Sequence, residues 1–181
     1  MNTPAHYTRT AIGLHWVIAL LIMAAFGLGW LMTDITGFTM TKLKYYSWHK
    51  WLGITVFLLA VIRLLWRFFH TPPALSSHIP VWQQWAAHAV HWLLYALIFA
   101  IPLSGYFYSL AAGVPVVYLG LVPLPVWLEP NIGLANTLKQ VHVILNYSLV
   151  GLLLAHVGAA LKHQLIDRDG TLGRMLPFLN K

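Results

Sequence analysis

The sequence predicts an all-α membrane protein, a four-transmembrane-helix bundle with both termini in the cytoplasm. Of its 181 residues, 59% are hydrophobic and only 8% are charged. Soluble domains carry roughly 25% charged residues, because their surfaces must face water. Four apolar runs each approach or exceed the ~20 residues that a helix needs to cross a bilayer. We therefore expect lipid to surround a single domain that covers residues 1–181.

The predicted spans and their connections differ clearly in composition. The four spans cover about residues 12–32, 49–69, 86–110 and 141–162. The first connection, Thr33–Trp48, is polar. The second, His70–Gln84, contains three prolines, which stop a helix. The third, Gly113–Asn136, is apolar but is broken by four prolines. It is too interrupted to span, so we expect it to lie at the membrane interface or to cap the bundle.

The distribution of basic residues predicts the orientation. Side A is the side of the N-terminus, the second connection and the C-terminal tail, and side B is the opposite side. Side A holds seven cations, including all five arginines, and side B holds four lysines. The positive-inside rule makes side A cytoplasmic. The side-A cations are Arg9, Arg63, Arg67, Lys162, Arg168, Arg174 and Lys181. They are scattered singly rather than gathered in a patch, which argues against a nucleic-acid partner.

Histidine is the residue that carries the predicted chemistry. The chain has ten histidines, four acidic residues and no cysteine, which excludes disulfides, iron–sulfur clusters and thiolate metal sites. His142 and His156 are fourteen residues apart, which brings them within about 40° of the same helix face and about 21 Å apart along the axis. His142 lies at the depth of His49, and His156 at the depth of His15. Two couples follow, His49 with His142 and His15 with His156.

Two haems suit these couples better than zinc does. A b-type haem takes two neutral imidazoles on opposite faces of the porphyrin, and facing helices can present them. A single zinc ion would need three or four ligands at one depth. A histidine taken alone has an ordinary alternative, a hydrogen bond to headgroups or water, but ionisable groups inside spans are rare and usually functional. Small residues one turn beyond three of the ligands leave room for a porphyrin: Ala19, Gly53 and Ala160.

Five further residues lie near side A, and each has more than one candidate role. His88 and His91 begin the third span, and His163 lies at the membrane surface beyond the fourth. Any of the three could replace a side-A ligand, but contacts with haem propionates, water or a quinone headgroup suit them better. Arg63 and Arg67 lie one turn apart at the side-A end of the second span. Membrane anchoring is their favoured role, and pairing with propionates or a quinone oxygen is the alternative.

The combined motifs resemble those of the bacterial cytochrome b561 family of four-helix, dihaem membrane proteins. The resemblance covers nearly the whole chain and implies haem ligation at the positions of the four paired histidines. It also implies a multi-pass protein of the bacterial inner membrane. The longer third connection departs from the family pattern. The matching segments are Gly13-Leu-His15-Trp16, His49-Lys-Trp-Leu-Gly53, Val61-Ile-Arg63, Thr71-Pro72-Pro73, Ala87-His88-Ala-Val-His91, Pro102-Leu-Ser-Gly105, His142, His156, His163 and Asp169-Gly-Thr-Leu-Gly-Arg174-Met-Leu-Pro177.

The resemblance also implies a membrane oxidoreductase. One branch of the family oxidises superoxide on the periplasmic side and reduces ubiquinone. The side-B lysines are compatible with this activity, because a cationic surface raises the local concentration of a small anion. One alternative is a cytochrome b subunit that passes electrons from a partner dehydrogenase or hydrogenase to quinone. Another is a haem-bearing sensor without turnover. Short connections and the lack of an extra domain favour a self-contained unit. The side-B lysines are Lys42, Lys44, Lys50 and Lys139.

Overall fold

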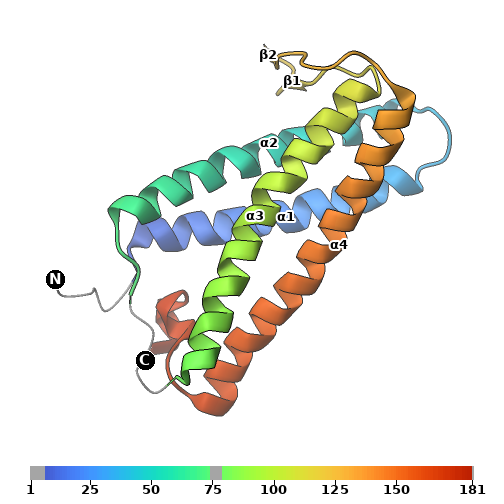
Figure 1. The fold of residues 1–181 in the computed structure, drawn as a ribbon. Coiled ribbons are helices and arrows are strands. Elements are labelled where there is room, and N and C mark those ends of the chain that lie inside the picture. The colour runs from blue at the N-terminus through green and yellow to red at the C-terminus, as the bar shows by residue number, and fades with distance from the viewer. Residues whose placement is uncertain (1–6, 74–78, 181) are drawn as a thin grey trace.

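Four long helices make up most of the protein (Figure 1). The structure is a computed structural model that describes residues 7–73 and 79–180. Each helix is long and apolar enough to cross a membrane, which confirms the predicted all-α, four-helix membrane architecture. The helices are α1 (Arg9–Asp34), α2 (Met40–Phe69), α3 (Val81–Ala111) and α4 (Ile132–Lys162).

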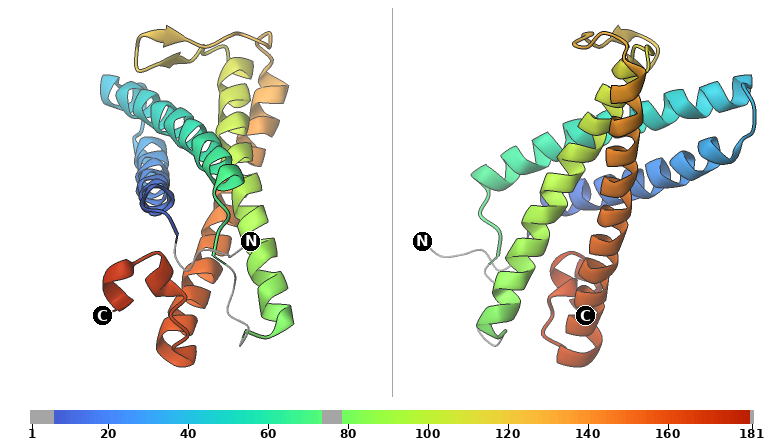
Figure 2. Two further views of the ribbon diagram at one scale, coloured as in Figure 1. Left: turned by 90° about the vertical axis from the view of Figure 1, so that its left-hand side faces the viewer. Right: turned by 45° about the vertical axis from the view of Figure 1, so that its right-hand side comes forward.

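The helices form two antiparallel pairs that cross obliquely. Helix α1 packs against α2, α3 packs against α4, and α2 joins the two pairs by packing against α3 (Figure 2). The α1–α2 connection and the segment between α3 and α4 lie toward one end of the molecule, side B, and the C-terminal segment lies toward the opposite end, side A (Figure 1). A histidine on any helix can therefore face a histidine on another helix only at matching depth.

The outer surface of the helices is apolar. Leu20 is 59% exposed, Met23 is 60% exposed and Leu154 is 70% exposed. A soluble protein rarely exposes large contiguous apolar areas. These side chains therefore have the positions expected of residues that face lipid acyl chains.

All four helices begin earlier than the sequence predicted. Polar side chains define three of these starts: the side-chain oxygens of Thr8, Thr39 and Asn131 accept hydrogen bonds from backbone N–H groups of the first turn. The predicted start of the second span at 49 is therefore wrong by nine residues, since α2 begins at Met40. Most of the polar segment Thr33–Trp48 is helix. Hydropathy detects the part of a helix within hydrocarbon, whereas the helix itself continues into the headgroup region.

The proline-rich third connection caps the side-B end of the bundle. It forms a short hairpin from β1 (Val117–Tyr118) and β2 (Val122–Pro123). Trp51 Nε1 of α2 donates to the Val117 carbonyl at 2.8 Å. The hydroxyls of Thr55 and Tyr118 are hydrogen-bonded at 2.9 Å. These two contacts bind the cap to α2, which agrees with the capping role considered for this connection.

The chain after α4 turns back toward the bundle. A π-helical turn covers His163–Asp167, and Arg168 follows with a left-handed φ of 52°. Two 3₁₀ turns, Leu172–Arg174 and Pro177–Asn180, complete the described chain. Trp16 Nε1 of α1 donates to the Met175 carbonyl at 3.0 Å. The C-terminal segment is thus held against α1 at side A.

Candidate functional site

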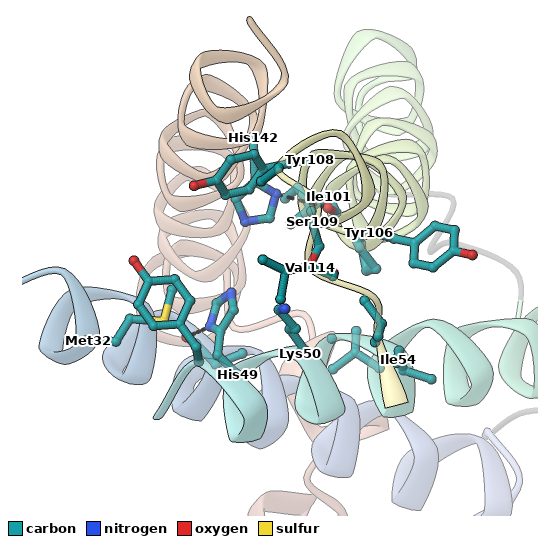
Figure 3. Close-up of a pocket in the computed structure, with 18 of the residues that line it drawn as sticks. Met32, His49, Lys50, Ile54, Ile101, Tyr106, Tyr108, Ser109, Val114 and His142 are labelled. Carbon is teal, nitrogen blue, oxygen red and sulfur yellow. Dashed lines mark hydrogen bonds between the residues drawn. The ribbon is translucent and has the colours of Figure 1, made fainter. Parts of the chain in front are cut away.

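Two histidines from different helices face each other near side B. His49 of α2 and His142 of α4 have ring centres 6.2 Å apart. Figure 3 shows both rings directed into the same space between the helices. His49 lies nine residues after Met40 (49 − 40), and His142 lies ten residues after Ile132 (142 − 132). At 1.5 Å per residue both lie about 14–15 Å from their helix starts. Matching depth brings the rings together.

A second facing couple lies near side A. His15 of α1 and His156 of α4 have ring centres 6.4 Å apart. His15 lies six residues after Arg9 (15 − 9), and His156 lies six residues before Lys162 (162 − 156). Both are therefore about 9 Å from the side-A ends of their helices. The structure thus brings together both histidine couples that the sequence predicted.

The spacing within each couple fits one iron ion between two imidazoles. Imidazole nitrogens bind transition metals at about 2.0–2.1 Å, and the centre of the ring lies about 1.15 Å behind the nitrogen. An ion midway between two rings therefore puts their centres about 6.3–6.5 Å apart when both nitrogens point at it. The observed distances are 6.2 and 6.4 Å. The residues fit bis-histidine haem ligation at both places.

Hydrogen bonds select the ring nitrogen that the side-B histidines present. His49 Nδ1 lies 2.8 Å from the Ala25 carbonyl oxygen. His142 Nδ1 lies 3.0 Å from both the Ile101 carbonyl oxygen and the Ser104 hydroxyl. Because a carbonyl oxygen only accepts, each Nδ1 must carry the hydrogen. The lone pair of each Nε2 is then available to a metal, and the Nδ1 hydrogen bond fixes the ring orientation.

Two glycines make room for these rings. A β-carbon at Gly29 would lie 3.3 Å from Cε1 of His49, and one at Gly105 would lie 2.9 Å from Cε1 of His142. Glycine inside a helix costs about 1 kcal/mol relative to alanine, and at these two positions the close approach of the imidazole ring accounts for it. Sequence reasoning missed both roles, although Gly105 belongs to one of the matched motifs. We expected Gly53 to leave room for a porphyrin, and a β-carbon added at Gly53 would meet no atom within 4 Å.

The side-B couple lines a cavity of about 400 Å³. This volume lies within the usual range for ligand pockets, roughly 300–1,000 Å³. The lining is mainly apolar and includes Gly53 of α2 and Val114 and Val116 of the cap. Lys50 is directed from α2 into the same space (Figure 3). A flat apolar group with acidic substituents would suit such a cavity.

A third imidazole lies close to the side-A couple. His91 of α3 has its ring centre 5.3 Å from that of His156. This distance is shorter than the 6.3 Å or so expected across an iron ion, so His15 is the better partner for His156. Arg67 lines a small recess together with His88 and His91.

Arg63 contacts the first helix near the side-A couple. One of its guanidinium nitrogens donates to the Ala11 carbonyl, one turn before His15. This bond links α2 to α1, which suits a structural role. Arg63 and Arg67 thus both lie at the side-A end of α2, Arg63 bonded to α1 and Arg67 beside His88 and His91.

His163 lies among carboxylates that the sequence analysis did not connect with it. Its Nδ1 is 2.7 Å from Asp169 Oδ2 and 3.1 Å from Asp167 Oδ2. Burial raises the pKa of Asp169, but hydrogen bonds from Thr171 and His163 outweigh that effect and hold the pKa below its usual value. The two aspartates four and six residues after His163 in the sequence were the available signal.

Comparison with known proteins gives the family. Residues 6–178 match the family described as prokaryotic cytochrome b561. The chain belongs to the prokaryotic cytochrome b561 family. It is therefore a multi-pass bacterial membrane protein of electron transfer, and its family implies b-type haem.

Three relatives in this family match almost the full chain. Cytochrome b561 homolog 2 of Escherichia coli is 38% identical, over 97% of this chain and 93% of its own length. The probable superoxide oxidase CybB of Yersinia pestis is 32% identical, over 94% of this chain and 96% of its own length. Cytochrome b561 homolog 1 of Escherichia coli is 29% identical, over 94% of this chain and 97% of its own length.

Proposed function

We propose that this cytochrome b561 protein holds two b-type haems and transfers electrons from periplasmic superoxide to ubiquinone. The observation that carries the proposal is the pair of facing histidine couples, 6.2 and 6.4 Å between ring centres, one near each end of the bundle. His49 and His142 would hold the side-B haem, and His15 and His156 the side-A haem. Haem supplies one-electron transfer at a potential set by its ligands and surroundings.

The protein's own groups would tune and hold the side-B haem. The Nδ1 hydrogen bonds of His49 and His142 raise the basicity of the ligating nitrogens. The mainly apolar lining of the cavity, to which the cap contributes Val114 and Val116, surrounds the couple with few polar groups. Both effects come from fixed backbone and packing, so they cost no rearrangement during electron transfer.

Side B suits a small anionic electron donor. Four lysines lie there, and Lys50 extends into the cavity that contains the side-B couple. Lys42 lines the same cavity but donates to the Ile35 carbonyl at 2.8 Å. Lys50 therefore has the better position to attract superoxide. The relative named probable superoxide oxidase, at 32% identity, supports this choice of donor.

Side A is the proposed place of quinone reduction. Two superoxide ions lose one electron each and become oxygen, and one quinone takes up both electrons and two protons. The excess of arginine on side A supports a cytoplasmic position and hence insertion in the inner membrane. His163 lies at this face as a quinone contact. Arg63 and Arg67 anchor α2, with propionate contacts as their second role.

Spectroscopy and kinetics of the purified protein test this function. We expect two low-spin haems per chain in a reduced-minus-oxidised spectrum and a pyridine haemochrome count. Superoxide should reduce both haems, and a soluble ubiquinone should then reoxidise them and accelerate superoxide loss. Protein without added quinone is the control. A colourless protein, or superoxide loss that quinone does not accelerate, would show that the proposed function is wrong.

A second function is a cytochrome b subunit that accepts electrons from a dehydrogenase or hydrogenase. The apolar surface of the side-B cap favours it, since Leu121 is 81% exposed and Trp127 is 69% exposed. In that case the haems would be reduced slowly by superoxide and fast in the presence of a partner. The same kinetic experiment separates the two functions.

A further inference from the structure

The turn after α4 brings two carboxylates back onto the His163 ring. Helix α4 ends at Lys162, and the π-helical turn lets the N–H of Arg168 bond to the His163 carbonyl. The left-handed Arg168 then reverses the chain, and the Asp169 N–H reaches the same carbonyl at 3.3 Å. Thr171 N–H holds the other oxygen of Asp169 at 2.9 Å. Single π-helical turns are rare and frequently occur at functional sites.

The geometry decides which His163 nitrogen carries a hydrogen. Both nearby carboxylate oxygens lie beside Nδ1, at 2.7 Å for Asp169 and 3.1 Å for Asp167. An ionised carboxylate only accepts hydrogen bonds, so Nδ1 must donate. The remaining nitrogen, Nε2, is left to exchange a proton with a ligand. Histidine with its second nitrogen held by a carboxylate is suited to general acid–base catalysis.

The charges around His163 favour proton transfer over metal binding. One ligand atom from each of His163, Asp167 and Asp169 lies within 4.8 Å of the others, which is close enough for a metal ion. However, Lys162 Nζ lies 2.6 Å from Asp167 Oδ2 and already compensates that carboxylate. The Asp169 charge is then balanced when the imidazole carries a second proton. Arg174 lies on the 3₁₀ turn that follows.

The position of the turn places it near the side-A histidine couple. His163 follows His156 by seven residues, or about 10 Å along the helix axis. Trp16, whose ring is 5.1 Å from that of His15, donates to the Met175 carbonyl and holds the C-terminal segment beside α1. The His163 side chain is 16% exposed, so water reaches it while the protein shields most of it. A quinone headgroup at this face would lie close to the proposed side-A haem, which supplies electrons, and to His163, which supplies a proton.

We propose that Asp169 is a positioning residue that makes His163 the proton donor to the reduced quinone. This inference rests on the proposed quinone reduction at side A. Asp169 keeps one hydrogen on Nδ1, so that His163 gives its Nε2 proton to a quinone oxygen as that oxygen gains negative charge. The imidazole then stays neutral, with its hydrogen on Nδ1, until water returns a proton to Nε2. Two such transfers, together with two electrons, convert one quinone to one quinol.

The experiment measures the quinone step separately from the superoxide step. Haem-loaded protein is first reduced with dithionite, and reoxidation by soluble ubiquinone is followed from about pH 5 to 9. Asp169→Asn should keep two haems per chain and normal reduction by superoxide, but reoxidise at least tenfold more slowly with an altered pH profile. Asparagine can offer either its oxygen or its N–H₂ to the ring, so it no longer dictates the tautomer. Asp169→Glu, which keeps the carboxylate, should recover part of the rate.

Matched controls separate positioning from mere folding. Asp34→Asn makes the same chemical change in the side-B end of α1 and should leave reoxidation unchanged. Asp167→Asn removes the negative charge at the longer of the two contacts and should slow reoxidation less than Asp169→Asn. An unchanged reoxidation rate and pH profile in Asp169→Asn would overturn the inference. It would also be overturned if Asp169→Asn slowed reduction by superoxide as much as reoxidation by quinone. Inhibition of wild-type reoxidation by EDTA would likewise overturn it, because it would indicate a bound metal ion. Failure of superoxide to reduce the wild-type haems would instead count against the proposed electron donor.

Discussion

The Cα of Gly105 lies directly against the imidazole of His142. A β-carbon at Gly105 would be 2.9 Å from Cε1 and 3.2 Å from Nδ1 of that ring. The contact joins α3 to α4 at the level of the side-B cavity. It therefore couples the packing of two helices to the orientation of one proposed haem ligand.

Gly105→Ala should weaken the side-B haem site. The added methyl forces the His142 ring or the helix to shift, and such overpacking costs about 1–3 kcal/mol. Haem content should fall from two toward one per chain, measured by pyridine haemochrome. Gly27→Ala is the matched control, because a β-carbon there meets nothing within 4 Å. It should keep both haems, since alanine favours a helix by about 1 kcal/mol over glycine. Equal haem content in both variants would contradict this interpretation of Gly105.

Loss of one histidine should remove one haem and leave the other. His142→Ala should abolish the side-B haem and superoxide-driven reduction, whereas His156→Ala should abolish the side-A haem and slow quinone reduction. Low-temperature EPR and haem counting distinguish the two products. His70→Ala is the control, because that ring stacks on Trp66 with centres 4.0 Å apart and His70 belongs to neither of the two couples. Loss of both haems, or of neither, in His142→Ala would mean that the pairing is wrong.

Weakening the side-B cap should speed loss of the side-B haem. Trp51→Phe removes the N–H that donates to the Val117 carbonyl, while keeping an aromatic ring in place. A lost hydrogen bond costs about 0.5–1.5 kcal/mol, which corresponds to roughly a 2- to 13-fold faster opening. Transfer of haem to excess apomyoglobin measures the rate. Trp30→Phe, at a 67% exposed position of α1, should transfer haem at the wild-type rate. No difference between these two variants would show that the cap does not retain the haem.

The C-terminal turn should resist mild acid. The pKa of Asp169 is lowered in the folded protein, because hydrogen bonds from Thr171 and His163 outweigh burial. Its ionised form therefore adds stability above the ordinary carboxyl pKa, and that stability is lost as pH falls through the lowered value. Hydrogen exchange of the Thr171 amide, corrected for intrinsic rates, should stay slow at pH 5 and accelerate only below about 3.8, the ordinary value. Asp169→Asn should remove this acid transition, and acceleration already near pH 6 would contradict it.

Much of the fold and both histidine couples were predictable before the structure. Periodicity and span length place His142 and His156 on one face of one helix, and matching depths select their partners. The helix ends were not predictable in the same way. Hydropathy reports where lipid begins, whereas the N-caps Thr8, Thr39 and Asn131 decide where hydrogen bonding begins. The comparison with known proteins confirms the predicted family.

The sequence by itself determined the membrane location of this protein, its four helices and the depths of its histidines. These properties follow from composition and from the constant rise of a helix, so they need no knowledge of neighbours. Only the tertiary structure decided which glycines the imidazole rings pack against, which backbone carbonyls fix the ring tautomers, and which carboxylates contact His163. The glycine and carbonyl contacts depend on how the helices cross, which brings residues distant in sequence within a few ångströms of each other. The carboxylate contacts depend on the turn after α4, where an unusual backbone conformation reverses the chain.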